Sequence, residues 1–239
     1  MAGQPATPRT DLLSRRGPAV SHARWVCLDV GETLVDETRV WETWADSLGI
    51  PRLTFMAAFG AAIERGGQHA DVFHVLGIND WRARLPAIEA AYGGFRSSDL
   101  YPDVLPALAA LAKTGWRIAV IGNQPARRTA ELRGLGVVPE VMAMSDEMGL
   151  AKPDPAFFRR ALQLMGDPDP GDVAYVGDRI DNDVLPSSAA GMRSVWLRRG
   201  PWGVIAEAAP REAALVVDSL EELARRVHEA WPGRHADIA

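Results

Sequence analysis

The sequence predicts an α/β fold in which helices cover both faces of a parallel sheet, with an all-helical unit inserted after the first strand. Three observations lead to this prediction. Short apolar runs typical of buried strands recur along the chain, helical patterns lie between them from residue 100 onward, and residues 37 to 98 carry helical patterns only. Strands that alternate with helices form parallel, three-layered sheets, because each helix carries the chain back to the edge where the preceding strand began.

The predicted strands are short and almost entirely apolar. The first runs from Trp25 to Leu28 and stops at Asp29. It is too short for a helix, and its lack of alternation is typical of a strand buried on both faces. Similar runs occur at Arg117 to Ile121, Asp172 to Val176 and Ser194 to Leu197, with weaker candidates at Val141 to Met144 and Leu215 to Val217.

Helix signals separate these strands. Apolar residues at helical spacing over 105–112 predict one helix, and Gly115 ends it in the left-handed conformation that glycine favours. Asp154 is an N-cap residue followed by Pro155 at the first helical position, and Gly166 closes that helix.

The inserted stretch, residues 37 to 98, shows helices alone. Trp41, Trp44 and Leu48 lie on one helix, an apolar stripe over 55–63 marks a second, and Asn79 is expected to cap a third that ends at Gly93-Gly94. Its aromatic residues are expected to form the core of this unit.

The polar residues of the insert are expected on its solvated face. This applies to its arginines, at positions 39, 52, 65, 82, 84 and 96, whereas His69 and His74 lack metal-ligand spacing and are expected to be surface or hydrogen-bonded residues rather than ligands. The other interpretation is an aromatic and cationic pocket for a phosphorylated ring compound. Residues 198 to 203, of sequence RRGPWG, are expected to form a turn.

Composition excludes several classes of protein. The 239 residues include 26 basic and 31 acidic side chains, so the net charge of −5 provides no basic surface for nucleic acid. The longest uncharged run, Leu53 to Ile63, is far shorter than the roughly 20 residues that span a bilayer. The N-terminal 22 residues lack the apolar stretch of a signal peptide, so we expect a flexible tail and a cytoplasmic protein. Cys27, the single cysteine, is expected to be a buried strand thiol.

Polar residues gather where the predicted strands end. Asp29 follows the first strand, Gly122-Asn123-Gln124 the second, and Gly177-Asp178 another, with Asp181 and Asp183 shortly after. Ligands of parallel sheets bind at this edge. Carboxylates without nearby His or Cys favour a hard cation such as Mg²⁺.

Lysine is rare in this chain, and one of its two lysines lies near these carboxylates. Lys113 ends a predicted surface helix, whereas Lys152 lies in the loop before the helix capped by Asp154. A compact ammonium there suits a phosphate oxygen or a carboxylate nucleophile. Each of these groups alone could equally be a turn or cap residue, so it is their order and spacing that favour a site.

Four segments in order resemble the motifs of the haloacid dehalogenase (HAD) superfamily. They are LDVGETLVD at Leu28 to Asp36, AVIGN at Ala119 to Asn123, AKPDPAFF at Ala151 to Phe158, and YVGDRIDNDVLPSSAAGM at Tyr175 to Met192. The resemblance covers about residues 25 to 228 and implies a Rossmann-like core over 23–36 and 99–229, a helical cap over 37–98 and a C-terminal tail over 230–239.

The resemblance also implies roles for individual residues. Asp29 is expected to be the nucleophile that forms an aspartyl-phosphate, and Lys152 to neutralise it. Mg²⁺ is expected to bind the Asp29 carboxylate, the Gly31 carbonyl, Asp178 and Asp183. Thr33 is expected to steady the loop after the nucleophile. The phosphate is expected to contact Thr33, Gly122, Asn123 and Lys152.

Two positions depart from the family pattern. Gly31 stands where the phosphatases usually carry a second Asp, which protonates the leaving group and later activates water. General acid and base catalysis contributes about 10²- to 10⁴-fold, so Glu32 or a water molecule is a candidate to replace it. Gly122 stands where the family usually has Ser or Thr, which leaves backbone N–H groups and Gln124 to contact the phosphate.

The sequence therefore predicts a Mg²⁺-dependent hydrolase of a phosphorylated small molecule. Two alternatives stay open: a binding or regulatory protein that has lost turnover, and a dehalogenase, whose relatives also lack the second Asp but do not keep the Gly-Asp motif of Asp178. A phosphonate hydrolase that uses a lysine of the cap is disfavoured, because residues 37 to 98 contain no lysine. The oligomeric state cannot be predicted.

Overall fold

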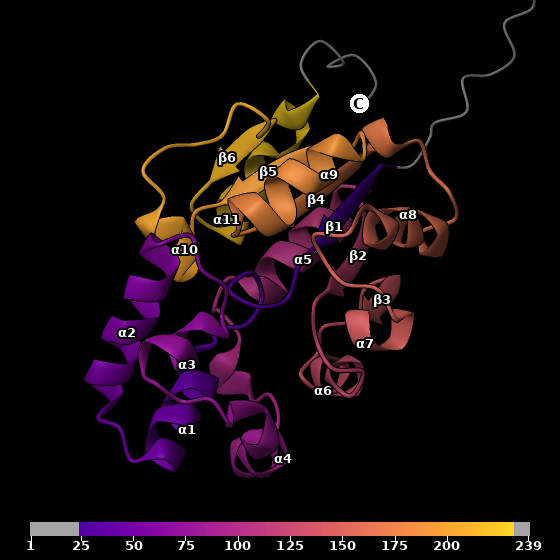
Figure 1. Cartoon of the computed structure of the whole chain (residues 1–239). Coiled ribbons are helices and arrows are strands. Elements are labelled where there is room, and N and C mark those ends of the chain that lie inside the picture. Colours follow the sequence, from indigo (N-terminus) through magenta and orange to yellow (C-terminus); the bar gives the residue numbers. More distant parts are fainter. Residues whose placement is uncertain (1–23, 232–239) are drawn as a thin grey trace, which may run out of the picture.

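The computed structural model describes residues 24 to 231, and these contain one six-stranded parallel sheet (Figure 1). The strand order is β3-β2-β1-β4-β5-β6, which confirms the predicted α/β class. The strands are β1 (Trp25–Leu28), β2 (Arg117–Gly122), β3 (Val141–Met144), β4 (Val173–Gly177), β5 (Arg193–Leu197) and β6 (Leu215–Val217).

Strand β1 lies at the point where the sheet reverses its order. It pairs with β2 on one side and with β4 on the other, Leu28 lying opposite Val120 and Val176. The chain adds β2 and β3 on one side and then returns across β1 to add β4, β5 and β6. Such a switch point opens a crevice at the carboxyl ends of the strands, which is where ligands of these sheets bind.

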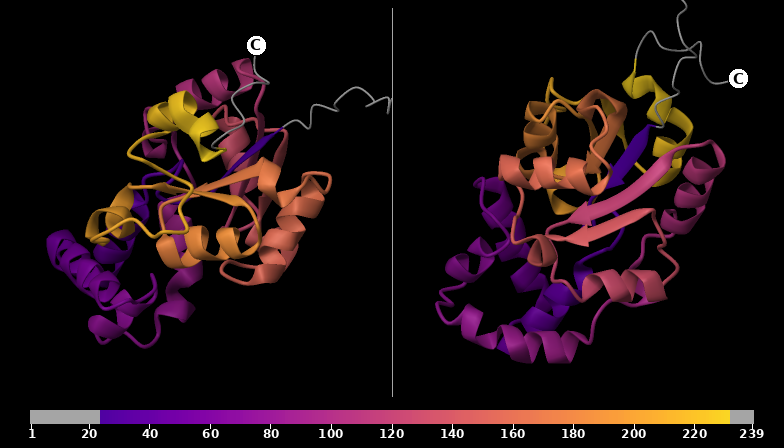
Figure 2. Two further views of the ribbon diagram at one scale, coloured as in Figure 1. Left: turned by 90° about the horizontal axis from the view of Figure 1, so that it is seen from above. Right: turned by 90° about the vertical axis from the view of Figure 1, so that its right-hand side faces the viewer.

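Both faces of the sheet are covered, which explains why the strands are apolar throughout. In β1, Val26 and Leu28 pack into one core, and Trp25 and Cys27 into the other. Helices α5 (Val104–Lys113), α6 (Arg128–Gly134) and α11 (Leu220–Arg226) contribute to the first core, and α7 (Ser145–Met148) and α8 (Pro155–Leu164) to the second, where α9 (Leu185–Ala189) lies beside α8 (Figure 2).

The insert forms a helical unit with a hydrophobic core of its own. Its helices are α1 (Thr38–Leu48), α2 (Arg52–Glu64), α3 (Asp71–Val75) and α4 (Trp81–Tyr92). Trp41, Trp44 and Phe55 are buried in its core, as expected. Helix α3 was not predicted, and the residue before α4 is Asp80 rather than Asn79, which the sequence suggested as the cap.

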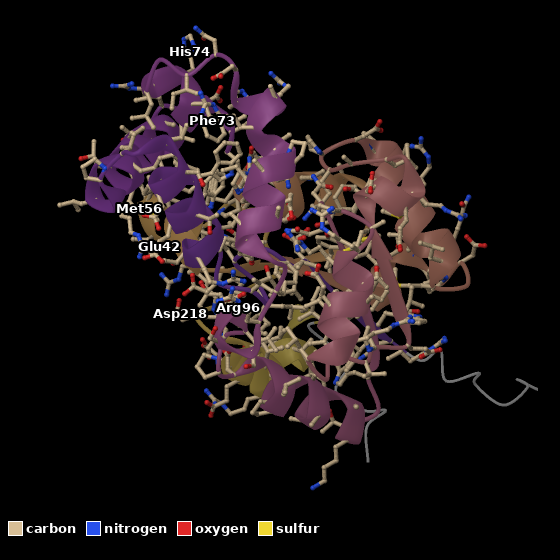
Figure 3. All side chains as sticks on the ribbon, turned by 90° about the horizontal axis from the view of Figure 1, so that it is seen from below. Glu42, Met56, Phe73, His74, Arg96 and Asp218 are labelled. Atoms are coloured by element: carbon tan, nitrogen blue, oxygen red, sulfur yellow. The ribbon has the colours of Figure 1, made fainter. Side chains whose placement is uncertain are left out.

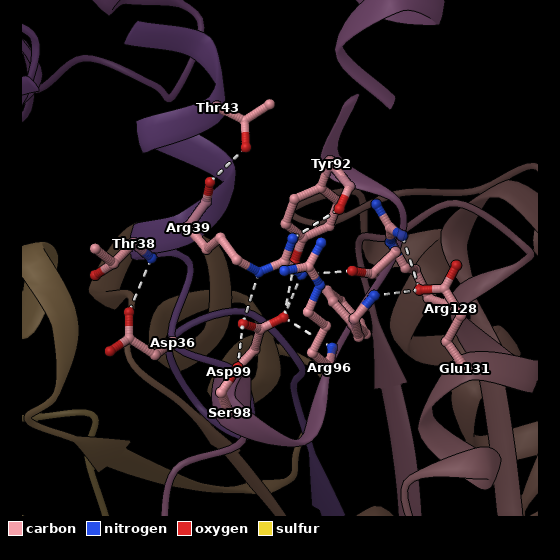
Figure 4. Close-up of polar contacts among 12 residues, drawn as sticks. Asp36, Thr38, Arg39, Thr43, Tyr92, Arg96, Ser98, Asp99, Arg128 and Glu131 are labelled. Carbon is pink, nitrogen blue, oxygen red and sulfur yellow. Dashed lines mark hydrogen bonds and ion pairs between the residues drawn. The ribbon is translucent and has the colours of Figure 1, made fainter. Parts of the chain in front are cut away.

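One arginine of this unit is not on its solvated face, contrary to the sequence-based expectation. The guanidinium of Arg39 donates to the Asp99 carboxylate (Nε–Oδ1 2.8 Å) and to the carbonyl of Tyr92 (2.7 Å), and its carbon lies 3.9 Å from the Tyr92 ring centroid (Figure 4). Asp99 also accepts the backbone N–H of Arg96. The two chain segments that join the unit to the sheet are therefore bound to each other.

Two segments near the C-terminus differ from the sequence-based expectations. Residues 200 to 205 form helix α10 (Gly200–Ile205) rather than a turn, and Trp202 packs against Phe59 of α2 (ring centroids 5.5 Å apart). The C-terminal tail was expected to begin at residue 230, but Trp231 is still buried, against Trp116. The expected tail segments 1–22 and 232–239 lie outside the described residues.

Four short 3₁₀ or π segments complete the described part, at Ser97–Asp99, Pro170–Asp172, Ile180–Val184 and Val227–Ala230. Among residues 24 to 231, no helix is both long and apolar enough to cross a membrane.

Candidate active site

A cavity of about 210 Å³ opens where β1, β2 and β4 end. The sheet contributes Asp29, Lys152 and Asp178 to its lining, and the helical unit contributes Gln68 and His69. The residues that the sequence placed at the strand ends therefore meet at the switch point, and the helical unit forms the other wall.

Lys152 bridges two carboxylates at the base of this cavity. Its Nζ lies 2.7 Å from Asp29 Oδ1 and 2.5 Å from Asp183 Oδ1. Burial alone would lower the pKa of Lys152, but the charges of Asp183 and Asp29 more than offset this and raise it. The ammonium thus stays charged beside the expected nucleophile.

Asn123 holds the lysine loop against the end of β2. Its Nδ2 donates to the carbonyl of Lys152 (2.9 Å), and its Oδ1 accepts the Lys152 N–H (2.8 Å). The sequence had suggested Asn123 as a phosphate contact. Its side-chain amide positions the backbone of the lysine, and its backbone N–H stays the expected phosphate contact.

Three aspartates form a group that suits a divalent cation. Asp29, Asp178 and Asp183 each offer an oxygen, and these oxygens lie within 4.8 Å of one another. Asp178 Oδ2 is buried and has no hydrogen-bond partner within the described part of the chain. Burying a carboxylate oxygen that accepts no hydrogen bond costs free energy unless a cation binds it. The three aspartates therefore fit Mg²⁺, because they offer the oxygen ligands that it prefers and one of these oxygens has no other partner in the described structure.

Burial shifts the pKa values of these carboxyls. It raises the pKa of Asp29 to about 6, although Lys152 acts in the opposite direction. It raises the pKa of Asp178 well above its usual range, with a further contribution from the charge of Asp183. A bound divalent cation would favour the ionised form of both carboxyls.

Glycines end β2 and β4 because the carboxylates approach their Cα atoms closely. A Cβ at Gly122 would lie 2.4 Å from Asp29 Oδ1, and one at Gly177 would lie 2.3 Å from Asp183 Cγ. Gly122, where the family usually has Ser or Thr, therefore provides the space that the Asp29 carboxylate occupies here.

The loop after β1 orients Thr33 and Glu32. Thr33 is buried, its carbonyl accepts from Arg199 (3.0 Å), and its Oγ1 has no partner among residues 24 to 231. Glu32 accepts from the Tyr101 hydroxyl (2.5 Å) and from the Glu37 N–H (3.0 Å). Burial, together with the nearby Glu37, raises the pKa of Glu32 to about 7.

Sequence reasoning did not identify which residues of the helical unit line the cavity, among them Glu37 and Gln68. His69, which was not expected at a ligand site, also lines the cavity, and so does Gln124 after β2, which the sequence had suggested as a phosphate contact. The signal for Glu37 was its position directly after the first motif. His69 offered no signal, because only folding brings its loop to the strand ends. His74, by contrast, is exposed at the outer edge of the helical unit, as expected (Figure 3).

Comparison with known proteins assigns this sequence to one family. A family model for haloacid dehalogenase-like hydrolases matches residues 23 to 191. The chain belongs to this family. Among curated relatives, this HAD-like hydrolase is similar to phosphoglycolate phosphatase 1 of Pseudomonas aeruginosa, with 30% identity over 84% of this chain and 78% of that protein.

Other relatives match over shorter regions. A glyceraldehyde 3-phosphate phosphatase of Methanopyrus kandleri is 37% identical over 43% of this chain and 45% of its own length. The HAD-like hydrolase thus spans about half of the first curated relatives that it matches.

Solved structures share the fold. The HAD-hydrolase YfnB of Bacillus subtilis superimposes with a TM-score of 0.63 at 18% identity, over 85% of this chain and 98% of that one. Solved dehalogenases share the fold as well. At this level of identity the structures establish the architecture of the HAD-like hydrolase and not its substrate.

Proposed function

We propose that this HAD-like hydrolase cleaves phosphate monoesters of small molecules through a phosphoenzyme on Asp29, with Mg²⁺ as cofactor. The observation that carries the proposal is the bridge of Lys152 between Asp29 and Asp183, next to the unpartnered Oδ2 of Asp178. The phosphatase relatives support the substrate class.

The reaction divides into two displacements at phosphorus. An Asp29 oxygen attacks the phosphorus, the bond to the leaving oxygen breaks, and that oxygen keeps the electron pair and is released as the alcohol after protonation. Water then attacks the phosphorus, and the bond to Asp29 breaks with its electron pair returning to the carboxylate. One hydroxyl of the phosphate product comes from water, and the enzyme is regenerated.

Lys152 acts on both the nucleophile and the transferring group. Its fixed positive charge, buried with Asp29 and Asp183, offsets the repulsion between an anionic carboxylate and an anionic phosphate. Backbone N–H groups at Gly122 and Asn123 remain candidates to contact the phosphate oxygens. Thr33 is a further candidate through its unpartnered hydroxyl.

The cation site consists of Asp29, Asp178, Asp183 and the carbonyl of Gly31. The cation supplies charge that stabilises the transferring phosphoryl group. The backbone of Arg179 orients Asp183, because the Arg179 backbone N–H donates to Asp183 Oδ2 (3.0 Å).

We also propose that residues 37 to 98 act as a cap that excludes water from the cavity during the reaction. Gln68 of the helical unit bonds to both Arg179 (2.5 Å) and Asp181 (3.1 Å) of the sheet domain, which supports a closed arrangement. The cytoplasm, rich in phosphorylated metabolites, is the proposed location.

The experiment is phosphate release from a panel of monoesters and from p-nitrophenyl phosphate, with Mg²⁺ or with a chelator. We expect Mg²⁺-dependent release by the wild type and loss of release in Asp29→Asn. Mg²⁺ should also raise the Tm of the wild type and not that of Asp178→Asn, because a cation that binds only the native state stabilises it. A protein that binds phosphorylated ligands but turns over none of them would favour the regulatory alternative, and halide release from 2-haloacids would favour the dehalogenase.

A further inference from the structure

The carboxylate of Glu37 fills the space that the missing side chain at position 31 leaves. A Cβ built on Gly31 would lie 2.5 Å from Glu37 Oε1 and 2.9 Å from Glu37 Cδ. An aspartate holds its own carboxylate at a similar distance from its Cβ. The glycine therefore leaves no empty space beside Asp29, because a carboxylate from the first turn of the helical unit occupies it.

Side chains from both walls of the cavity orient this carboxylate. Gln124 Nε2, after β2, donates to Glu37 Oε1 (3.2 Å), and His69 Nε2 lies 3.5 Å from Glu37 Oε2. Arg179 Nη1 lies 3.3 Å from His69 Nδ1. Because arginine can only donate, His69 Nδ1 accepts, and the ring proton is on Nε2, facing Glu37.

The backbone of Glu37 is fixed as well. Its N–H donates to Glu32 Oε1 (3.0 Å), and its carbonyl accepts from Val40 and Trp41 at the start of α1. Both oxygens of Glu32 are thereby engaged, one by Glu37 and the other by Tyr101. Glu32 is a positioning residue for Glu37 in this arrangement.

We propose that Glu37 is the general base that activates water in the second step, in place of the aspartate that is absent at position 31. This rests on the proposed function. The water oxygen attacks the phosphorus of phospho-Asp29, one water proton passes to a Glu37 oxygen, and the bond to Asp29 breaks with its electron pair returning to the carboxylate. Hydrogen phosphate leaves, and Glu37 then releases the proton to solvent.

Other acidic groups of the cavity are less suited to this step. Asp183 is bound to Lys152 through Oδ1 and to the Arg179 N–H through Oδ2. Asp178 belongs to the proposed cation site. Glu37 pairs with neither Lys152 nor the aspartates of the proposed cation site. Its carboxylate lies beside Gly31, the position two residues after the nucleophile Asp29.

The test is the time course of p-nitrophenol release by Glu37→Gln with Mg²⁺. This leaving group departs without a proton, so the first step should proceed and the second should stall. We expect a burst of p-nitrophenol equal to the enzyme concentration, followed by a steady rate about 10²- to 10⁴-fold below that of the wild type. Phosphorylated Asp29 should accumulate in acid-quenched enzyme.

The matched control is Glu42→Gln, which changes a glutamate within α1 (Figure 3) that pairs with Arg52. It should show no burst and the wild-type rate. A second variant, Glu37→Ala with Gly31→Asp, moves the carboxylate back to the position used by the family and should restore the steady rate at least 10-fold over Glu37→Ala.

The outcomes separate this proposal from the proposed function. A wild-type rate in Glu37→Gln, or a slow rate without a burst, would overturn the role of Glu37 while leaving the phosphatase intact. Failure of the double variant to exceed Glu37→Ala would also count against it. If the wild type releases no phosphate from any ester, the proposed function fails and this proposal with it.

Discussion

Substitution of Gly122 by alanine tests whether close approach to the nucleophile explains the glycine at the end of β2. The added Cβ would lie 2.4 Å from Asp29 Oδ1 and 3.1 Å from Val30 Cγ2, and contacts below 3.0 Å force one partner to move. The strand backbone is held by its pairing with β3, so the carboxylate is the part that must shift. That shift disturbs its 2.7 Å contact with Lys152.

A displacement of about 1 Å at a reacting group costs about 10²-fold in rate, so we expect kcat/KM for p-nitrophenyl phosphate to fall by roughly that factor. The insertion should also lower the free energy of unfolding by about 1 to 3 kcal/mol. Both are measured with purified variants, by Mg²⁺-dependent phosphate release and by urea unfolding.

The matched control is Gly60→Ala in α2, where, apart from its chain neighbours and the adjacent backbone of the helix, no described atom lies within 4 Å of the added carbon. It should leave kcat/KM unchanged and stabilise the helix by about 0.5 to 1 kcal/mol. Wild-type kcat/KM in Gly122→Ala would refute the reasoning, because the nucleophile would then tolerate the contact.

Three further predictions concern buried groups. Lys152→Met leaves Asp29 and Asp183 without their shared cation, so the free energy of unfolding without Mg²⁺ should fall by about 3 to 5 kcal/mol in urea titrations, and an unchanged value would contradict the bridge. Cys27 is fully buried with a raised pKa, so Ellman's reagent should modify it only after unfolding; rapid labelling of native protein would contradict this burial. Glu32 has a pKa raised from 4.5 to about 7, so the native state holds a proton that the unfolded state has lost, and stability should fall by up to roughly 3 kcal/mol as pH rises through this window. Glu32→Gln should flatten that slope in unfolding titrations, and an equal slope in both proteins would exclude Glu32 as its source.

The sheet was predictable because its strands are short and buried on both faces. Runs such as Trp25 to Leu28 are too short for a helix and typical of strands buried on both faces, and the carboxyl ends of such strands meet at one edge. Asp29, Lys152, Asp178 and Asp183 follow from that placement, and the structure brings them together.

The other wall of the site could not be predicted in the same way. His69 and Gln68 lie on a loop of the helical unit, and their position over the strand ends depends on how that unit packs against α10 and the loop after β4. Helix α10 itself begins at a Gly-Pro pair, which typically signals a turn. Arg39 was misplaced because its partner Asp99 lies 60 residues away in the sequence.

The structure also changes how the two unusual glycines are understood. From the sequence, both are positions where a side chain usual in the family is missing from the reaction centre. Glu37 occupies the space beside Gly31, and the Asp29 carboxylate occupies the space beside Gly122. Each glycine thus makes room for a carboxylate supplied by another residue. Packing therefore explains both departures from the family pattern.

The central claim is that Asp29 carries the phosphoryl group, and trapping that intermediate tests it most directly. Wild-type enzyme mixed with Mg²⁺ and p-nitrophenyl phosphate is quenched within one turnover and treated with borohydride, which reduces an acyl phosphate to an alcohol. Mass spectrometry of the peptide that spans residues 25 to 39 should find homoserine at position 29. Phosphate release without any reduction at Asp29, or with reduction at another carboxylate, would contradict the account.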